Sequence, residues 1–156
     1  MRVNHPSKRE ATATSLISRI VIPAGDLAVR DGLKALFSRL PLSQLSEEDR
    51  STVEIVLAEA LNNIVEHAYA NSQGEIEISL SMRARDLQIC IVDTGLPMPG
   101  GELPKARQPL TDSTRDLPEG GFGWLLIRSL SQDVSYRRDG RRNQLCFRLK
   151  TKQHKH

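Results

Sequence analysis

Alternating or short apolar segments and helically spaced apolar residues follow one another along this chain in a regular order. The short and alternating segments predict five strands, over residues 15–23, 75–82, 87–93, 134–138 and 144–150. Apolar residues recurring every three to four positions predict three helices, over residues 26–40, 46–70 and 124–131. Asp26 is expected to cap the first helix, and Ser46 with Asp49 forms a non-ideal capping box before the second.

This order of elements predicts the fold class. Strands that follow one another pair locally while the helices cover one face, so we expect an α+β two-layer sandwich with a mixed, mostly antiparallel sheet. The chain lacks the regular strand–helix alternation of a Rossmann domain. We expect a flexible leader over residues 1–14, one domain over residues 15–150 and a basic tail over residues 151–156.

The segment over residues 94–119 breaks the pattern. It holds five of the eight prolines, together with glycines and many charges, and shows no periodicity. Because a structureless stretch of this length is unusual inside a domain, it indicates a functional lid or disorder.

Composition narrows the class of protein. Hydrophobic residues make up 38% and charged residues 26%, which is typical of a globular domain. The polar start of the chain has no apolar signal region, and no apolar run is long enough to cross a bilayer, so a cytoplasmic protein is expected. In a reducing cytosol, Cys90 and Cys146, both in apolar strand-like segments, are predicted to be buried free thiols.

The net charge of +3 is unevenly distributed. Residues 137–156 hold eight Lys or Arg and one Asp. Such a basic end can indicate nucleic-acid binding. Aromatic residues make up only 4% of the chain and offer no stacking platform, so a solvated strand edge and tail is the favoured interpretation.

The second predicted helix carries a polar stripe. Glu59, Asn63 and His67 are spaced four residues apart, so they share one side of the helix, beside the apolar arc rather than opposite it. A polar stripe at the margin of a buried face can form a pocket wall. For any one of these residues alone, a solvated helix side is the simpler explanation.

Two further motifs could bind a nucleotide. Asp93 ends a predicted strand, where its carboxylate could accept a hydrogen bond from an amino group, and Gly95 would allow close backbone approach. Gly120, Gly121, Phe122 and Gly123 precede the third helix, where free backbone N–H groups suit phosphate oxygens. Taken alone, the Asp-Thr-Gly tripeptide is better explained as an ordinary turn, and the glycines can be explained by loop flexibility.

Taken together, these motifs follow a specific order: Glu-x-x-x-Asn on a helix, Asp-x-Gly at a strand end, a long lid, and Gly-x-Gly before a helix. This order resembles the GHKL (Bergerat-fold) ATPase superfamily. The segments "LAEALNNIVEHAY" and "GGFGWLLIRSL" are most similar to the stand-alone anti-sigma-factor serine kinases.

The resemblance implies a role for each matching residue, with ATP and Mg²⁺ as cofactors. Glu59 matches the general base, Asn63 the magnesium ligand, and Asp93, beside Gly95, the residue that binds the adenine amino group. His67 matches a supporting position. The phosphate-binding loop would be formed by Gly120, Gly121, Phe122 and Gly123, with Gly121 and Gly123 as the family's phosphate-binding glycines.

Three departures from the family pattern stand out. Pro97 replaces a second glycine that many members have, and Glu119 stands where some have a basic residue. A lid cation could be supplied by Lys105, Arg107 or Arg115. The last hairpin, "RRNQLCFRL", lacks the threonine that often helps to bind adenine.

By resemblance, the leading hypothesis is a serine/threonine protein kinase. Its substrate would be an anti-anti-sigma antagonist protein; it would also sequester a sigma factor, and a homodimer is expected. The alternative is a catalytically weak, ATP-gated binding module. The catalytic half of a histidine kinase is disfavoured, because no upstream dimerisation helix with an acceptor histidine is present. A chaperone- or gyrase-type ATPase would need further domains.

Overall fold

The computed structural model describes residues 16–104 and 121–152. Within them lies a five-stranded sheet in the order β1-β2-β3-β5-β4. All four neighbouring pairs are antiparallel. The strands are β1 (Leu16–Pro23), β2 (Glu75–Arg83), β3 (Asp86–Asp93), β4 (Gln132–Asp139) and β5 (Arg142–Lys150).

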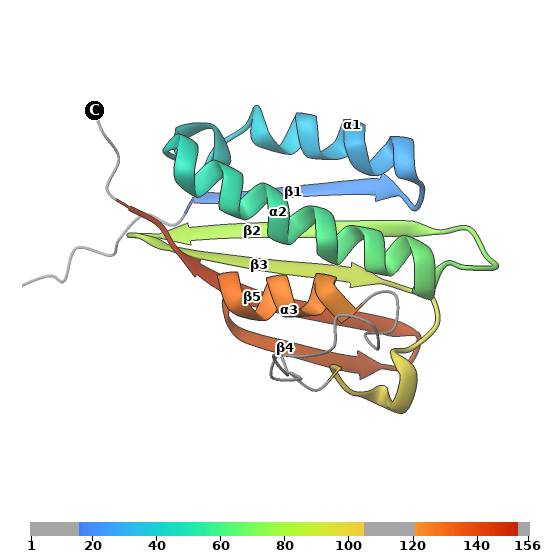
Figure 1. Ribbon diagram of the computed structural model, residues 1–156. Helices are drawn as coiled ribbons and strands as arrows, with labels where there is room; N and C mark the ends of the chain where they lie inside the picture. Colours follow the sequence, from blue (N-terminus) through green and yellow to red (C-terminus); the bar gives the residue numbers. More distant parts are fainter. Residues whose placement is uncertain (1–15, 105–120, 153–156) are drawn as a thin grey trace, which may run out of the picture.

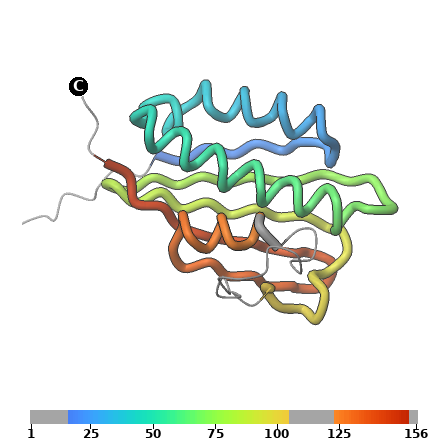
Figure 2. Tube along the Cα trace, in the orientation of Figure 1, coloured from blue at the N-terminus to red at the C-terminus, as the bar shows by residue number. Residues whose placement is uncertain are grey.

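Three helices, α1 (Asp26–Phe37), α2 (Glu47–Asn63) and α3 (Gly121–Leu130), lie over one face of this sheet (Figure 1). The trace in Figure 2 shows β1 at one edge and β4 at the other. The predicted α+β two-layer sandwich is therefore confirmed, with a sheet that is wholly antiparallel among the described strands.

The core lies between the helices and the sheet. Alternate residues of β2, β3 and β5 are buried against the helices, as the pleat of a half-covered sheet requires. From α2, fully buried residues such as Val56 and Leu57 belong to the same hydrophobic cluster as Phe147 of β5. Asp93 and Asn143 are the polar members of the buried rows, at the end of β3 and the start of β5.

The first helix differs from its predicted bounds at both ends. Its N-cap is Gly25, which has extended backbone and no side chain to cap with, so Asp26 is the first helical residue rather than the cap. The helix ends at Phe37 rather than near Leu40. The residue before a proline is disfavoured in helical conformation, and Pro41 follows Leu40.

The second helix begins as predicted but changes form near its end. Ser46 is the N-cap and its hydroxyl oxygen accepts a hydrogen bond from the Asp49 N–H at 3.2 Å. The Asp49 carboxylate instead accepts a hydrogen bond from the backbone N–H of Lys152 at 2.7 Å. After Asn63 the helix widens into a π-helical turn, Ile64–Ala68, in which the Tyr69 N–H donates to the Ile64 carbonyl five residues earlier at 3.1 Å.

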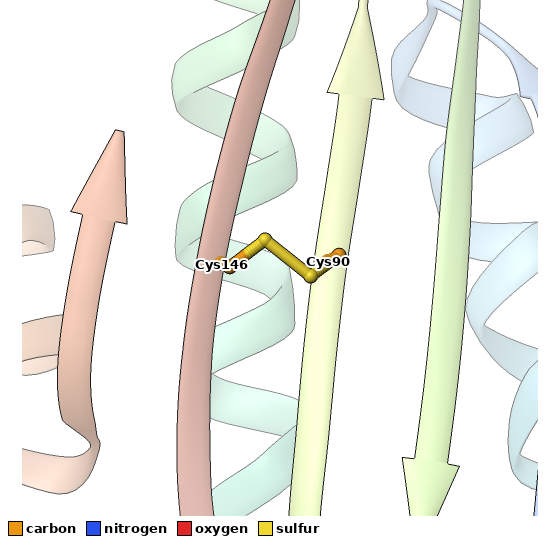
Figure 3. The surroundings of a disulfide bond; sticks show 2 residues. All are labelled: Cys90 and Cys146. Carbon is orange, nitrogen blue, oxygen red and sulfur yellow. A yellow bond between two sulfur atoms is a disulfide. The ribbon is translucent and has the colours of Figure 1, made fainter. Parts of the chain in front are cut away.

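The prediction that Cys90 and Cys146 are buried free thiols is wrong. The two residues are directly opposite in the β3–β5 register and are joined by a disulfide (Figure 3), with their Cα atoms 4.2 Å apart. Both are half-buried and alternate with the core-facing residues of their strands, so they lie on the face of the sheet away from the helices. The sequence prediction failed because it assumed a reducing environment and did not pair the two strands, which places the cysteines directly opposite each other.

Candidate functional site

A cavity of about 260 Å³ opens where the end of α2, the end of β3 and the start of α3 meet the β4–β5 hairpin. Its polar lining consists of Asn63, His67, Asp93, Tyr136 and Asn143, and its apolar lining includes Ile64, Leu96, Met98, Trp124 and Leu145. Three of the predicted site residues therefore reach one cavity: Asn63 from α2, His67 from the π-helical turn that follows it, and Asp93 from the end of β3.

Asp93 is held in the buried end of the cavity. Its Oδ1 accepts hydrogen bonds from the Gly95 N–H at 2.9 Å and from Asn143 Nδ2 at 2.8 Å. Burial raises the pKa of the Asp93 carboxyl above the ordinary 3.8, and the bonds from Asn143 and Gly95 and the charge of Arg138 oppose that rise. Among the described residues, both of these hydrogen bonds end on Oδ1, which leaves Oδ2 as the carboxylate oxygen available to a ligand.

Gly95 is needed for close approach, as predicted, but the group that it approaches is protein backbone. A Cβ at this position would lie 2.4 Å from the Ala68 carbonyl oxygen at the end of the π-helical turn. The neighbouring Leu96 N–H donates to that same oxygen at 2.9 Å. Gly95 therefore lets the loop after β3 dock on the end of the second helix.

Tyr69 holds the loop that follows β3 in place, and the sequence did not identify this tyrosine as a site residue. Its buried hydroxyl donates to the Glu75 carbonyl at 2.8 Å and accepts from the Thr94 N–H at 2.9 Å. One side chain thus ties the start of β2 to the residue that follows Asp93. A tyrosine that closes an apolar helix gives no distinct sequence signal, because it also fits an ordinary core position.

Glu59 and Asn63 lie against the first turn of α3. A Cβ on Gly123 would lie 2.7 Å from Glu59 Oε2 and 3.5 and 3.6 Å from the two amide atoms of Asn63. No side chain fits at position 123 without displacing the Glu59 carboxylate. The glycine therefore brings the N-terminal turn of α3 directly to the polar stripe of α2, which is the juxtaposition that the motif order predicted.

Asn63 is partly unsatisfied. Its Nδ2 is buried and has no hydrogen-bond partner among the described residues. Buried amides nearly always have partners, so an unpaired one that also lines a cavity suits a bound ligand. Among the described residues, no group of three or more His, Cys, Asp or Glu could hold a metal ion. A metal here would depend on Asn63 and on oxygens that a ligand or water supplies.

The π-helical turn begins directly after Asn63 and contains His67. Turns of this kind are rare and frequently occur at functional sites. His67 is exposed, and it lines the cavity. Its placement agrees with a supporting position at the cavity mouth.

The remaining predicted residues are only partly described. Gly121 begins α3. The side chain of Phe122, and all of Gly120, Lys105, Arg107 and Arg115, fall outside the described part of the structure. None of the described helices is long and apolar enough to span a membrane.

Comparison with known proteins gives consistent matches. Residues 26–149 match the family model described as histidine kinase-like ATPase domain. The chain is 32% identical over 94 residues to the serine-protein kinase RsbW of Bacillus thuringiensis and of Bacillus cereus, which covers 59% of this chain and 59% of each relative. The chain therefore spans less than two thirds of the curated relatives that it matches.

A solved structure supports the fold. The crystal structure of the RsbU and RsbW domains of Rv1364c from Mycobacterium tuberculosis superposes with a TM-score of 0.60 at 15% identity. The match covers 87% of this chain and 32% of that one.

Proposed function

We propose that this chain, which belongs to the histidine kinase-like ATPase domain family, binds ATP with Mg²⁺ in the cavity and acts as a serine/threonine protein kinase. The observation that carries the proposal is the meeting of Glu59 and Asn63 with Gly123 beside the cavity that Asp93 closes. Its 32% identity to serine-protein kinases supports the kinase reaction.

Asp93 would bind the base. Its Oδ2 is the available carboxylate oxygen and would accept a hydrogen bond from the adenine amino group. Apolar residues, among them Ile64, Leu96 and Leu145, line the same cavity and suit the faces of a purine ring.

Asn63 would hold the metal through its amide oxygen, with phosphate and water oxygens completing the shell. When bound, Mg²⁺ would neutralise charge on the phosphates. Gly121 and Gly123 would present backbone N–H groups of the first turn of α3 to phosphate oxygens.

Glu59 would act as the general base. It would accept the proton of the attacking hydroxyl as that oxygen bonds to the γ-phosphorus and the bond to the leaving ADP oxygen breaks. Its side chain is half-buried beside Asn63, one helical turn away.

We further propose the partners that the resemblance implies. The substrate would be a serine of an anti-anti-sigma antagonist, and the same protein, as a homodimer in the cytoplasm, would sequester a sigma factor. An ATP-gated binding module with little catalysis is the alternative outcome.

Glu59→Gln separates these two functions. We expect phosphate transfer from ATP to the antagonist to fall about 100-fold or more, because the variant loses the base. We expect ATP affinity to stay unchanged. The readout is radiolabelled phosphate on the antagonist alongside calorimetric ATP binding.

The matched control is Glu54→Gln, an exposed glutamate of the same helix. It should transfer phosphate at the wild-type rate. Wild-type protein that binds ATP and the antagonist but transfers no phosphate would establish the binding module instead.

A further inference from the structure

Asn143 occupies the position in β5 directly opposite Asp93 of β3, and its side chain is buried. Its Nδ2 donates to Asp93 Oδ1 at 2.8 Å, to the Gly95 carbonyl at 3.2 Å and to the Leu96 carbonyl at 3.0 Å. This one amide therefore contacts both the carboxylate of the site and the loop that follows it.

The opposite end of the amide is equally well defined. Asn143 Oδ1 accepts hydrogen bonds from the Tyr136 hydroxyl at 2.6 Å and from Arg138 Nη1 at 2.8 Å. A flipped amide would set its NH₂ against two donors and its oxygen against three acceptors. The Arg138 guanidinium cannot accept a hydrogen bond, and neither the Asp93 carboxylate nor the two carbonyls can donate one, so these four groups favour the observed orientation of the amide.

Tyr136 extends the network to the far side of the loop. Its hydroxyl accepts a hydrogen bond from the Met98 N–H at 3.0 Å while it donates to Asn143. Arg138 Nη1 also donates to the Gly95 carbonyl at 3.0 Å. The hairpin strands β4 and β5 thus hold the cavity wall formed by residues 95–98.

The network decides which oxygen of Asp93 a ligand can reach. A carboxylate with both oxygens free can rotate and offer either one. Here Asn143 and the Gly95 N–H fix Oδ1, so that Oδ2 is the oxygen left for a ligand.

We propose that Asn143 is a positioning residue for base recognition: it fixes the Asp93 carboxylate so that Oδ2 accepts the 6-amino group of adenine. Tyr136 assists by fixing the orientation of the Asn143 amide. This inference rests on the proposed ATP site and names the residue that gives that site its preference for an amino-bearing purine.

The test compares two ligands, ATP and purine riboside triphosphate, which lacks the 6-amino group. Wild-type protein should bind ATP about tenfold or more tightly, as one hydrogen bond to a charged group predicts. In Asn143→Leu only the Gly95 N–H still holds Oδ1, so the carboxylate is less firmly oriented and that ratio should fall. Fluorescence of Trp124, the single tryptophan and a cavity residue, reports binding of both ligands.

Gln144→Leu is the matched control, because Gln144 is the next residue of β5 and is half-buried on the opposite face of the sheet. It should keep the wild-type ratio. Asn143→Thr restores one donor hydroxyl and should recover part of the preference. Tyr136→Phe should lower the affinity ratio of the two ligands less than Asn143→Leu does, because Arg138 still donates to the Asn143 amide. These two variants carry the test if Asn143→Leu does not fold.

An equal loss of affinity for both ligands in Asn143→Leu, or in the two milder variants, would assign Asn143 a purely structural role and overturn the inference. Asp93→Asn distinguishes that failure from failure of the proposed function. If Asp93→Asn binds ATP as wild type does, the ATP site itself is wrong. If Asp93→Asn loses ATP while Asn143→Leu keeps the wild-type ratio, the inference about Asn143 alone fails.

Discussion

Single residues of the site continue the apolar rows of the sheet. Asp93 follows Leu87, Ile89 and Ile91 on the core-facing side of β3, and Asn143 begins the corresponding row of β5. A polar group in such a row must be hydrogen-bonded, because leaving it unsatisfied costs about 1–3 kcal/mol. The two residues satisfy each other across the strands and leave Asp93 Oδ2 for a ligand.

Two glycines serve different purposes at this scale. At Gly95 a side chain would meet the backbone of Ala68, which cannot move aside. At Gly123 it would meet the end of the flexible Glu59 side chain. A substitution at Gly95 therefore threatens the loop, whereas one at Gly123 threatens the position of the base.

Titration of Asp93 predicts a pH-dependent stability. Burial raises the pKa of Asp93 in the folded protein above 3.8. The folded state therefore binds the proton more tightly than the unfolded state does, which stabilises the fold fully below pH 3.8. This contribution to the free energy of unfolding is lost as the pH rises through the raised pKa. Asp93→Asn cannot titrate. The free energy of unfolding of Asp93→Asn, minus that of the wild type, should therefore increase as the pH rises from about 4 to about 7.

Urea unfolding of both proteins over this pH range, without nucleotide, measures that difference. A difference that stays constant, or that shrinks as the pH rises, would contradict the raised pKa. Other carboxylates titrate in both proteins and so cancel in the comparison.

The sequence identified Glu59, Asn63 and Asp93 as candidate site residues through the order of their motifs and the family resemblance, and their roles stay predictions. It did not predict Asn143, whose role depends on the residue opposite. Aligning the buried rows of the two strands would have placed Asn143 beside Asp93.

Among the elements, α2 departs most from its predicted form, and it does so at the site. The α-helix ends at Asn63 and the π-helical turn carries the chain to Tyr69, whose hydroxyl then holds Thr94. Helical spacing predicted one continuous helix, because apolar periodicity does not distinguish an α-helical from a π-helical turn over five residues. The strands were predicted within a few residues, since alternation and turn residues define them locally.

The disulfide between β3 and β5 joins the two strands that bring Asp93 and Asn143 together. Each cysteine lies three residues from its strand's site residue. Its stabilising effect comes mainly from restricting the unfolded chain, over a sequence separation of 56 residues. Reduction with dithiothreitol should therefore lower the free energy of unfolding by about 2–4 kcal/mol.

Urea unfolding with and without dithiothreitol tests this expectation. A variant carrying both Cys90→Ser and Cys146→Ser serves as the control and should not respond to reductant. Equal unfolding curves for oxidised and reduced wild-type protein would show that the cross-link contributes nothing to stability.

At the scale of the whole molecule, the site lies at one end of the sheet, where residues of α2, α3 and the strands β3, β4 and β5 line the cavity. The antiparallel sheet carries the described helices on one face (Figure 1). The cavity opens at the end of the sheet where β3 finishes and β5 begins. The order of strands along the chain predicted this layering, but not the strand order in the sheet, which places β5 between β3 and β4. That order results from long-range pairing, which local patterns do not contain.

The central claim is that this cavity binds ATP through Asp93. Calorimetric titration of ATP with Mg²⁺ into wild-type and Asp93→Asn protein tests it most directly. The variant keeps the oxygen that accepts from Gly95 and Asn143 but replaces the second oxygen with a donor, so it should fold and yet bind ATP about tenfold or more weakly. Equal affinity of the two folded proteins for ATP, or no binding by the wild type, would contradict the claim.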